Sequence, residues 1–130
     1  MTIAHHPGLS IERFSAALEL TQSGGVRLID RLAADGLVRR QKLTARSVKL
    51  HLTATGARAV KDIERARIAA AADLLSPLSS TQRRQLEAML ARILAARTHG
   101  QDDLRRICRL CSFDACESGG RTCPVSEAAG

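Results

Sequence analysis

Four cysteines stand within sixteen residues near the end of this 130-residue chain, in the spacing C-x2-C-x4-C-x6-C. At this density four thiolates can surround one soft metal ion tetrahedrally. Structural zinc is the expected occupant, and an iron–sulfur cluster, a thiol–disulfide redox switch and incidental buried thiols are the alternatives. The expected metal ligands are Cys108, Cys111, Cys116 and Cys123.

A second pattern with chemical meaning is a pair of arginines one helical turn apart, Arg27 and Arg31. Guanidinium groups make bidentate contacts with guanine edges and with phosphate oxygens, which makes DNA the first partner to consider. The alternative is an ordinary solvated helix face, which also carries such charges.

Residues 21–35 are predicted to form the helix that carries these arginines. Thr21 and Ser23 can cap its start, and Gly36 suits a left-handed stop at its end. Apolar residues recur at three- and four-residue spacing, so one stripe faces a core and polar residues face outward. The apolar stripe consists of Leu28, Ile29, Leu32 and Ala33. The outward face consists of Gln22, Ser23, Arg27, Asp30 and Arg31.

The elements around this helix have the order of a DNA-binding unit. Ser10 can cap a helix over residues 11–20, and residues 38–53 are predicted to form a β-hairpin because Val48, Leu50 and Leu52 alternate with polar residues. A basic hairpin after two helices is typical of a wing that contacts phosphates or the minor groove, and a solvated hairpin is the alternative. Its basic residues are Arg39, Arg40, Lys42, Arg46 and Lys49.

Two long amphipathic helices are predicted next, over residues 54–75 and 80–98. Thr53 can cap the first helix, and Ser79 with Gln82 has the form of a capping box at the second. Their apolar faces exceed what a small DNA-binding unit can cover, so pairing with another subunit is expected. Packing within the chain is the alternative.

Composition narrows the class of partner. The net charge of +7 favours a polyanion, while the presence of only two aromatic residues leaves little for binding modes that stack single-stranded bases. No apolar run reaches the length of a membrane span, and the first eight residues do not resemble a signal peptide, so a cytoplasmic location is expected.

An enzymatic role is not expected. A catalytic zinc needs an open coordination position and a nearby base, whereas four thiolates would close the shell. His51 and His99 belong to no recognisable catalytic group. A zinc hydrolase is therefore the weakest of the functions considered.

Four segments of the sequence resemble a known family. They are residues 20–23 (LTQS), 27–32 (RLIDRL), 35–40 (DGLVRR) and 50–56 (LHLTATG). Over roughly residues 9–97 the chain resembles MarR-type transcriptional regulators. The resemblance implies a dimer on a pseudo-palindromic operator of double-stranded DNA, with the helix at 21–35 in the major groove and the hairpin at 38–53 as the wing.

The resemblance also implies roles for individual residues. Gln22, Ser23 and Arg27 match base or phosphate contacts, and Arg46 matches the minor-groove arginine of such wings. Thr44 stands where family wings usually carry an aspartate. The expected DNA-binding residues are Thr21, Gln22, Ser23, Arg27, Arg31, Arg39, Arg40, Lys42 and Arg46.

The expected fold is mainly α with a small β-hairpin wing: a winged helix-turn-helix with long dimerisation helices. Family members begin with one or two further helices, and only about nine residues precede Ile11 here. The alternative function is therefore a truncated partner that pairs with a related regulator, as a heterodimer, without contacting DNA. The expected divisions are a flexible lead-in (1–9), the DNA-binding region (10–53), the dimerisation region (54–107) and a cysteine-rich metal-binding tail (108–130).

Overall fold

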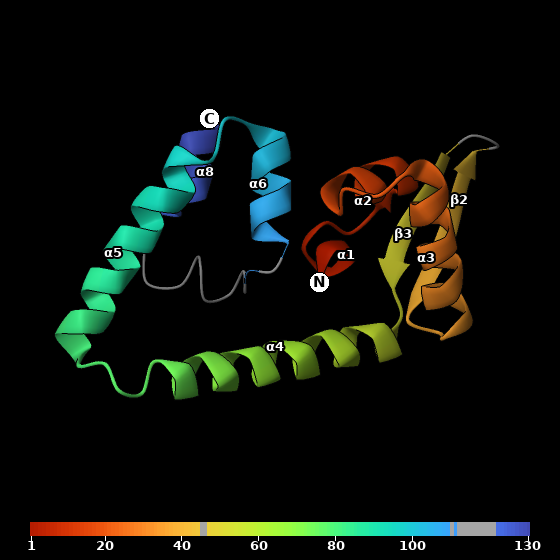
Figure 1. Cartoon of the computed structure of the whole chain (residues 1–130). Coiled ribbons are helices and arrows are strands. Elements are labelled where there is room, and N and C mark those ends of the chain that lie inside the picture. Colours follow the sequence, from red (N-terminus) through yellow and green to blue (C-terminus); the bar gives the residue numbers. More distant parts are fainter. Residues whose placement is uncertain (45–46, 110, 112–121) are drawn as a thin grey trace. The chain divides into compact units, whose positions relative to one another are not determined.

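The computed structural model describes residues 1–44, 47–109, 111 and 122–130, and it contains two compact units, Met1–Ile63 and Glu64–Gly130 (Figure 1). The described residues are mainly helical, with one three-stranded antiparallel sheet in the first unit. The predicted fold class is confirmed. Within these residues, no helix combines the length and the apolar content needed to cross a bilayer.

The helix-turn-helix follows the caps that the sequence predicts. Helix α2 (Ile11–Ala17) begins after Ser10, whose side chain accepts a hydrogen bond from the Arg13 amide at 3.3 Å. Helix α3 (Gln22–Ala34) begins after Thr21, whose side chain accepts from the Gly24 amide at 3.1 Å. Helix α2 is shorter than predicted, because the chain turns after Ala17 to enter α3.

The hairpin forms as predicted and gains a third strand. Strand β2 (Val38–Thr44) pairs with β3 (Ser47–Leu52), and β1 (Leu9–Ser10) pairs with the other edge of β3, giving the order β1-β3-β2. Side chains alternate between the two faces of a strand, so the buried Val38 and Leu50 can face the helices while their neighbours face solvent.

The core of the first unit lies between α2, α3 and the sheet. Ile29 of α3 and Leu50 of β3 are fully buried. Around them, partly buried leucines and isoleucines from the same elements complete the packing. The buried members of this core are Ile3, Leu9, Phe14, Ile29, Val38 and Leu50.

The prediction of a flexible lead-in over residues 1–9 is wrong. Residues Thr2–His5 form a short helix, α1, and Leu9 pairs with Leu50 in the sheet. Ile3 is 4% exposed and Leu9 is 7% exposed, so both side chains belong to the core. Burial of these two side chains gives the segment a fixed place that its short, non-periodic sequence does not reveal.

Helix α4 (Ala54–Leu74) begins at a tight junction with the loop that joins α3 to β2. The Thr53 hydroxyl donates to the Gly36 carbonyl at 2.6 Å, and the Thr53 amide donates to the Leu37 carbonyl at 3.0 Å. Thr53 Oγ1 also accepts from the Gly56 amide at 3.0 Å, which confirms the predicted cap. A Cβ at Gly56 would lie 2.0 Å from the Leu37 carbonyl oxygen, so only glycine permits this approach.

The second unit is helical in its described residues. Helix α5 (Ser80–Ala96) starts at the predicted capping box of Ser79 and Gln82. Helix α6 (Gln101–Cys108) begins after Gly100, and α8 (Pro124–Ala129) contacts both α5 and α6. Val125 and Cys108 are the buried apolar side chains of this group.

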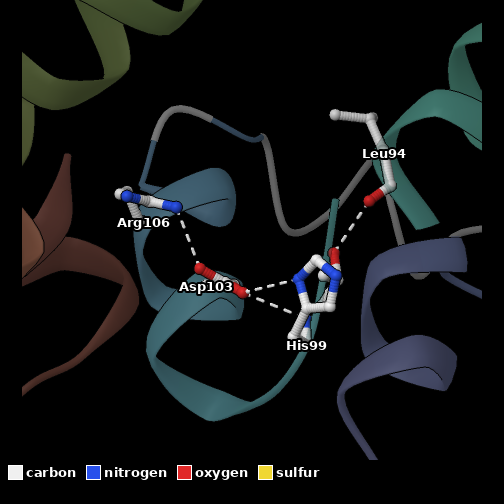
Figure 2. A network of polar contacts seen from close by, with 5 residues as sticks. Leu94, His99, Asp103 and Arg106 are labelled. Atoms are coloured by element: carbon white, nitrogen blue, oxygen red, sulfur yellow. Dashed lines mark hydrogen bonds and ion pairs between the residues drawn. The ribbon is translucent and has the colours of Figure 1, made fainter. Parts of the chain in front are cut away.

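Polar contacts fix the start of α6 (Figure 2). The His99 amide donates to the Asp103 carboxylate at 2.9 Å, and the Arg106 guanidinium donates to the same carboxylate at 2.9 Å. The backbone bond from His99, followed by the side chains of His99 and Arg106, lowers the pKa of Asp103 below its ordinary value. The ionised carboxylate in the first turn of α6 thus ties the helix to the residue before Gly100, which has no side chain that could cap the helix.

Close packing of α2 against α3 at Gly25 gives the first testable prediction. A Cβ at Gly25 would lie 1.8 Å from Ser15 Oγ and 2.9 Å from Ser15 Cβ, and the Ser15 hydroxyl is held by the Ile11 carbonyl at 2.8 Å. We expect Gly25→Ala to lower the free energy of unfolding by about 2 kcal/mol or more, measured by urea denaturation.

The matched control removes the other partner of the clash. Ser15→Gly alone should cost about 1 kcal/mol through lost helix propensity, yet it should restore stability when combined with Gly25→Ala. A double variant less stable than Gly25→Ala alone would contradict the packing of Gly25 on Ser15.

Candidate nucleic-acid interface

Helix α3 has one buried face and one exposed polar face. Gly25 and Ile29 are buried, whereas the five residues predicted to face outward are all exposed. At the start of the helix the Thr21 and Ser23 hydroxyls are 3.3 Å apart, so the cap also orients Ser23. The exposed residues are Gln22, Ser23, Arg27, Asp30 and Arg31.

The start of β3 lies beside the first turn of α3. Gln22 lines one shallow depression together with Ser47 and Val48, the first residues of β3. The other side of the depression is the first turn of α2. Gln22 therefore stands where the helix-turn-helix meets the hairpin.

The hairpin carries exposed cations on two different faces. All residues of β2 after Val38 are exposed. Because side chains alternate along a strand, Arg40 shares the face of Val38, which is the face toward the helices, and Arg39 has the opposite face. Arg40 forms an ion pair with Asp30 of α3, with 2.6 Å between Arg40 Nη1 and Asp30 Oδ1.

Asp30 is the functional candidate that the sequence-based prediction did not include among the site residues. The sequence feature that could have pointed to Asp30 is its place on the same outward helix face as Arg27 and Arg31. A carboxylate on a surface that meets phosphates is unfavourable unless a cation neutralises it. The partner, Arg40, is ten residues away and on another element, so local periodicity does not identify it.

Arg46 lies outside the described residues. The described part of β2 ends at Thr44, and β3 begins at Ser47. The role of Arg46 stays a prediction.

The positive charge of the chain is concentrated in the first unit. Residues 1–63 hold ten of the twenty lysines and arginines but only five of the thirteen acidic residues, hence five of the seven net positive charges. This asymmetry places the electrostatic attraction for a polyanion on the unit that contains α3 and the hairpin.

The described cysteines do not assemble the predicted metal centre. Cys108 ends α6 and is 6% exposed, the Cys111 amide donates to the Cys108 carbonyl at 2.9 Å, and Cys123 precedes α8. Cys116 lies outside the described residues. Among the described parts of the chain, no three histidine, cysteine or acidic side chains group closely enough to hold a metal ion.

Comparison with known proteins agrees with the geometry of the first unit. The model of the MarR family matches residues 1–46. The fold is similar to that of a MarR family protein from Bacillus stearothermophilus, at 23% identity and a TM-score of 0.65, over 70% of this chain and 64% of that chain. It is also similar to a MarR family transcriptional regulator from Silicibacter pomeroyi, at 28% identity and a TM-score of 0.54, over 72% of this chain and 64% of that chain.

A third similar structure was solved with its ligand. It is the complex of Staphylococcus aureus MepR with DNA, at 24% identity and a TM-score of 0.57, over 72% of this chain and 71% of that chain. Comparison with curated proteins found no match. The chain spans about two thirds of the length of the structures it resembles, 64% for the Bacillus protein. The MarR family model thus matches the part of the chain from α1 to β2, and the fold is similar to that of solved MarR family structures.

Proposed function

We propose that this protein is a transcriptional regulator that binds a pseudo-palindromic operator in double-stranded DNA, and that it is not an enzyme. The observation that carries the proposal is the exposed polar face of α3, held from behind by Ile29 and flanked by a basic hairpin. A helix presented in this way fits the major groove, and the hairpin then lies over the minor groove or the phosphates. The similar MepR structure, solved as a DNA complex, supports the same partner.

The proposal assigns different contacts to different residues. Gln22, Ser23 and Arg27 stand on the first two turns of α3, which are the turns that reach base edges in helix-turn-helix proteins. Arg31 lies one turn later, and its long side chain would contact a backbone phosphate. On the wing, Arg39, Lys42 and Arg46 would contact the backbone or minor groove.

We propose that helices α4 and α5 supply the dimer contact. Helices α4 and α5 expose large apolar side chains, with Ile68 58% and Ile93 57% exposed. Such a face is costly in water, and a second copy of the chain covers it in a two-fold arrangement that matches a palindromic operator. The exposed apolar residues of the two helices are Ile63, Ile68, Leu74, Met89, Leu90, Ile93 and Leu94. Pairing with a related regulator, without contact to DNA, is the alternative use of the same face.

We propose structural zinc as the ligand of the four cysteines. Support comes from their spacing and from the turn that brings Cys111 back to Cys108. The described residues alone do not form the site, so the proposal depends on Cys116, which lies outside them.

The role of α3 is tested on the DNA upstream of the protein's own gene. We expect Arg27→Ala to weaken binding to the footprinted site by roughly tenfold or more, because a good bidentate base contact contributes about 1–3 kcal/mol. Binding is measured by titration at several stated salt concentrations. Arg84→Ala, which removes the same charge from α5, is the matched control and should leave the affinity unchanged. Equal effects of the two substitutions would mean that α3 does not recognise the site.

The dimer contact is tested by placing a charge in the apolar face of α5. Ile93→Glu should convert a dimer into a monomer in light scattering at micromolar concentration, because burying an unpaired carboxylate is costly. Operator affinity should fall with it, since each monomer contacts one half-site. The control is Gln85→Glu, an exposed polar position on the same helix. A wild-type chain that is monomeric would contradict the proposal, and a dimer without operator binding would favour the alternative partner role.

The metal is tested by elemental analysis of the purified chain. We expect about one zinc per chain in the wild type and none in Cys108→Ser, because one lost thiolate opens the shell. If the purified protein is brown and absorbs visible light, the ligand is an iron–sulfur cluster and not zinc. A metal-free chain with an oxidisable pair of cysteines would point to a redox switch.

A further inference from the structure

The ion pair between Asp30 and Arg40 joins the two elements that the proposed function places on DNA. Asp30 lies in the second half of α3, and Arg40 lies near the base of the wing, opposite Leu50 in the register of β2 and β3. The Arg40 side chain is 35% exposed and the Asp30 side chain is 56% exposed. An ion pair this exposed adds little to the stability of the fold, so we expect it to act by orienting α3 and the wing relative to each other.

Asp30 needs a partner because of where it stands. It follows Arg27 by three residues on the same face of α3, a spacing at which opposite charges attract each other. Without Arg40, its carboxylate would draw the Arg27 guanidinium along the helix and would repel phosphates. The ion pair with Arg40 satisfies the carboxylate from the side of the wing and leaves Arg27 to extend outward.

The Arg40 side chain in turn reaches toward α3. It shares a strand face with the buried Val38, whereas Arg39 has the opposite face. The backbone between the two partners passes through Gly36, at φ +67°, and the loop that ends at Leu37. The ion pair therefore closes that loop through side chains and sets the base of the wing against α3.

We infer that Arg40 is a positioning residue that acts through Asp30, and that it is not one of the DNA contacts. This inference rests on the proposed function and adds to it a role for the ion pair. The pair keeps α3 and the wing at the separation that lets both meet one operator half-site, and it neutralises Asp30. It therefore affects discrimination between DNA sequences more than attraction to DNA in general.

The test compares affinity for the footprinted operator with affinity for a shuffled duplex of the same length. Asp30→Asn and Arg40→Gln should each lower the ratio of operator affinity to shuffled-duplex affinity roughly tenfold. Both should do so although Asp30→Asn raises the net positive charge of the protein and Arg40→Gln lowers it. The double variant should lose no more than either single variant. The salt dependence of operator binding should stay the same in Arg40→Gln, because no phosphate contact is lost.

The matched control is Arg39→Gln, which removes the same charge from the other face of β2 and should lower the slope of log affinity against log salt by about 0.9 if Arg39 meets a phosphate. The inference is overturned if Arg40→Gln lowers that slope by a similar amount. It is equally overturned if Asp30→Asn tightens binding to both duplexes alike.

A second readout needs no DNA and separates this inference from the proposed function. Hydrogen exchange of the β2 amides should accelerate several-fold in both Asp30→Asn and Arg40→Gln but not in Arg39→Gln, because only the first two release the wing from α3. Unchanged exchange in all three would overturn the inference. A wild type that binds operator and shuffled duplex equally would instead overturn the proposed function.

Discussion

The short loop between α3 and β2 is the point on which the first unit depends. Its carbonyl groups at Gly36 and Leu37 accept hydrogen bonds from Thr53, and Gly56 lets the start of α4 approach Leu37 without a clash. The end of α3, the first strand of the hairpin and the first turn of α4 are thereby fixed to a few backbone atoms.

The exposed face of α3 is a consequence of how its other face is held. Ile29 fills the core without exposure, and Gly25 allows α2 to pass within contact of the α3 backbone. With these two positions turned to the core, Gln22, Ser23, Arg27, Asp30 and Arg31 lie on the opposite, exposed face of the helix. The ion pair between Asp30 and Arg40 then links that outer face to the hairpin, so the tertiary structure arranges the polar surface as well as the core.

The sequence predicted features that arise within one element. Helix caps at Ser10, Thr21, Thr53 and Ser79 follow from local hydrogen bonding, and the alternation of Val48, Leu50 and Leu52 follows from strand geometry. Features that join distant residues were missed. Helix α1 and strand β1 are too short for periodicity and are held by Ile3 and Leu9 in the core, while the link from Asp30 to Arg40 depends on tertiary structure. Arg46 and Cys116, by contrast, stay predictions because they lie outside the described residues.

Methylation interference on the operator tests most directly that α3 enters the major groove of a two-fold site. Methyl groups at guanine N7 lie in the major groove, so they should block binding at two clusters centred about 10–10.5 base pairs apart, or a multiple of that distance. Methyl groups at adenine N3 lie in the minor groove and should interfere where the wings lie. Binding that tolerates guanine N7 methylation throughout the protected region would contradict the placement of α3 in the major groove.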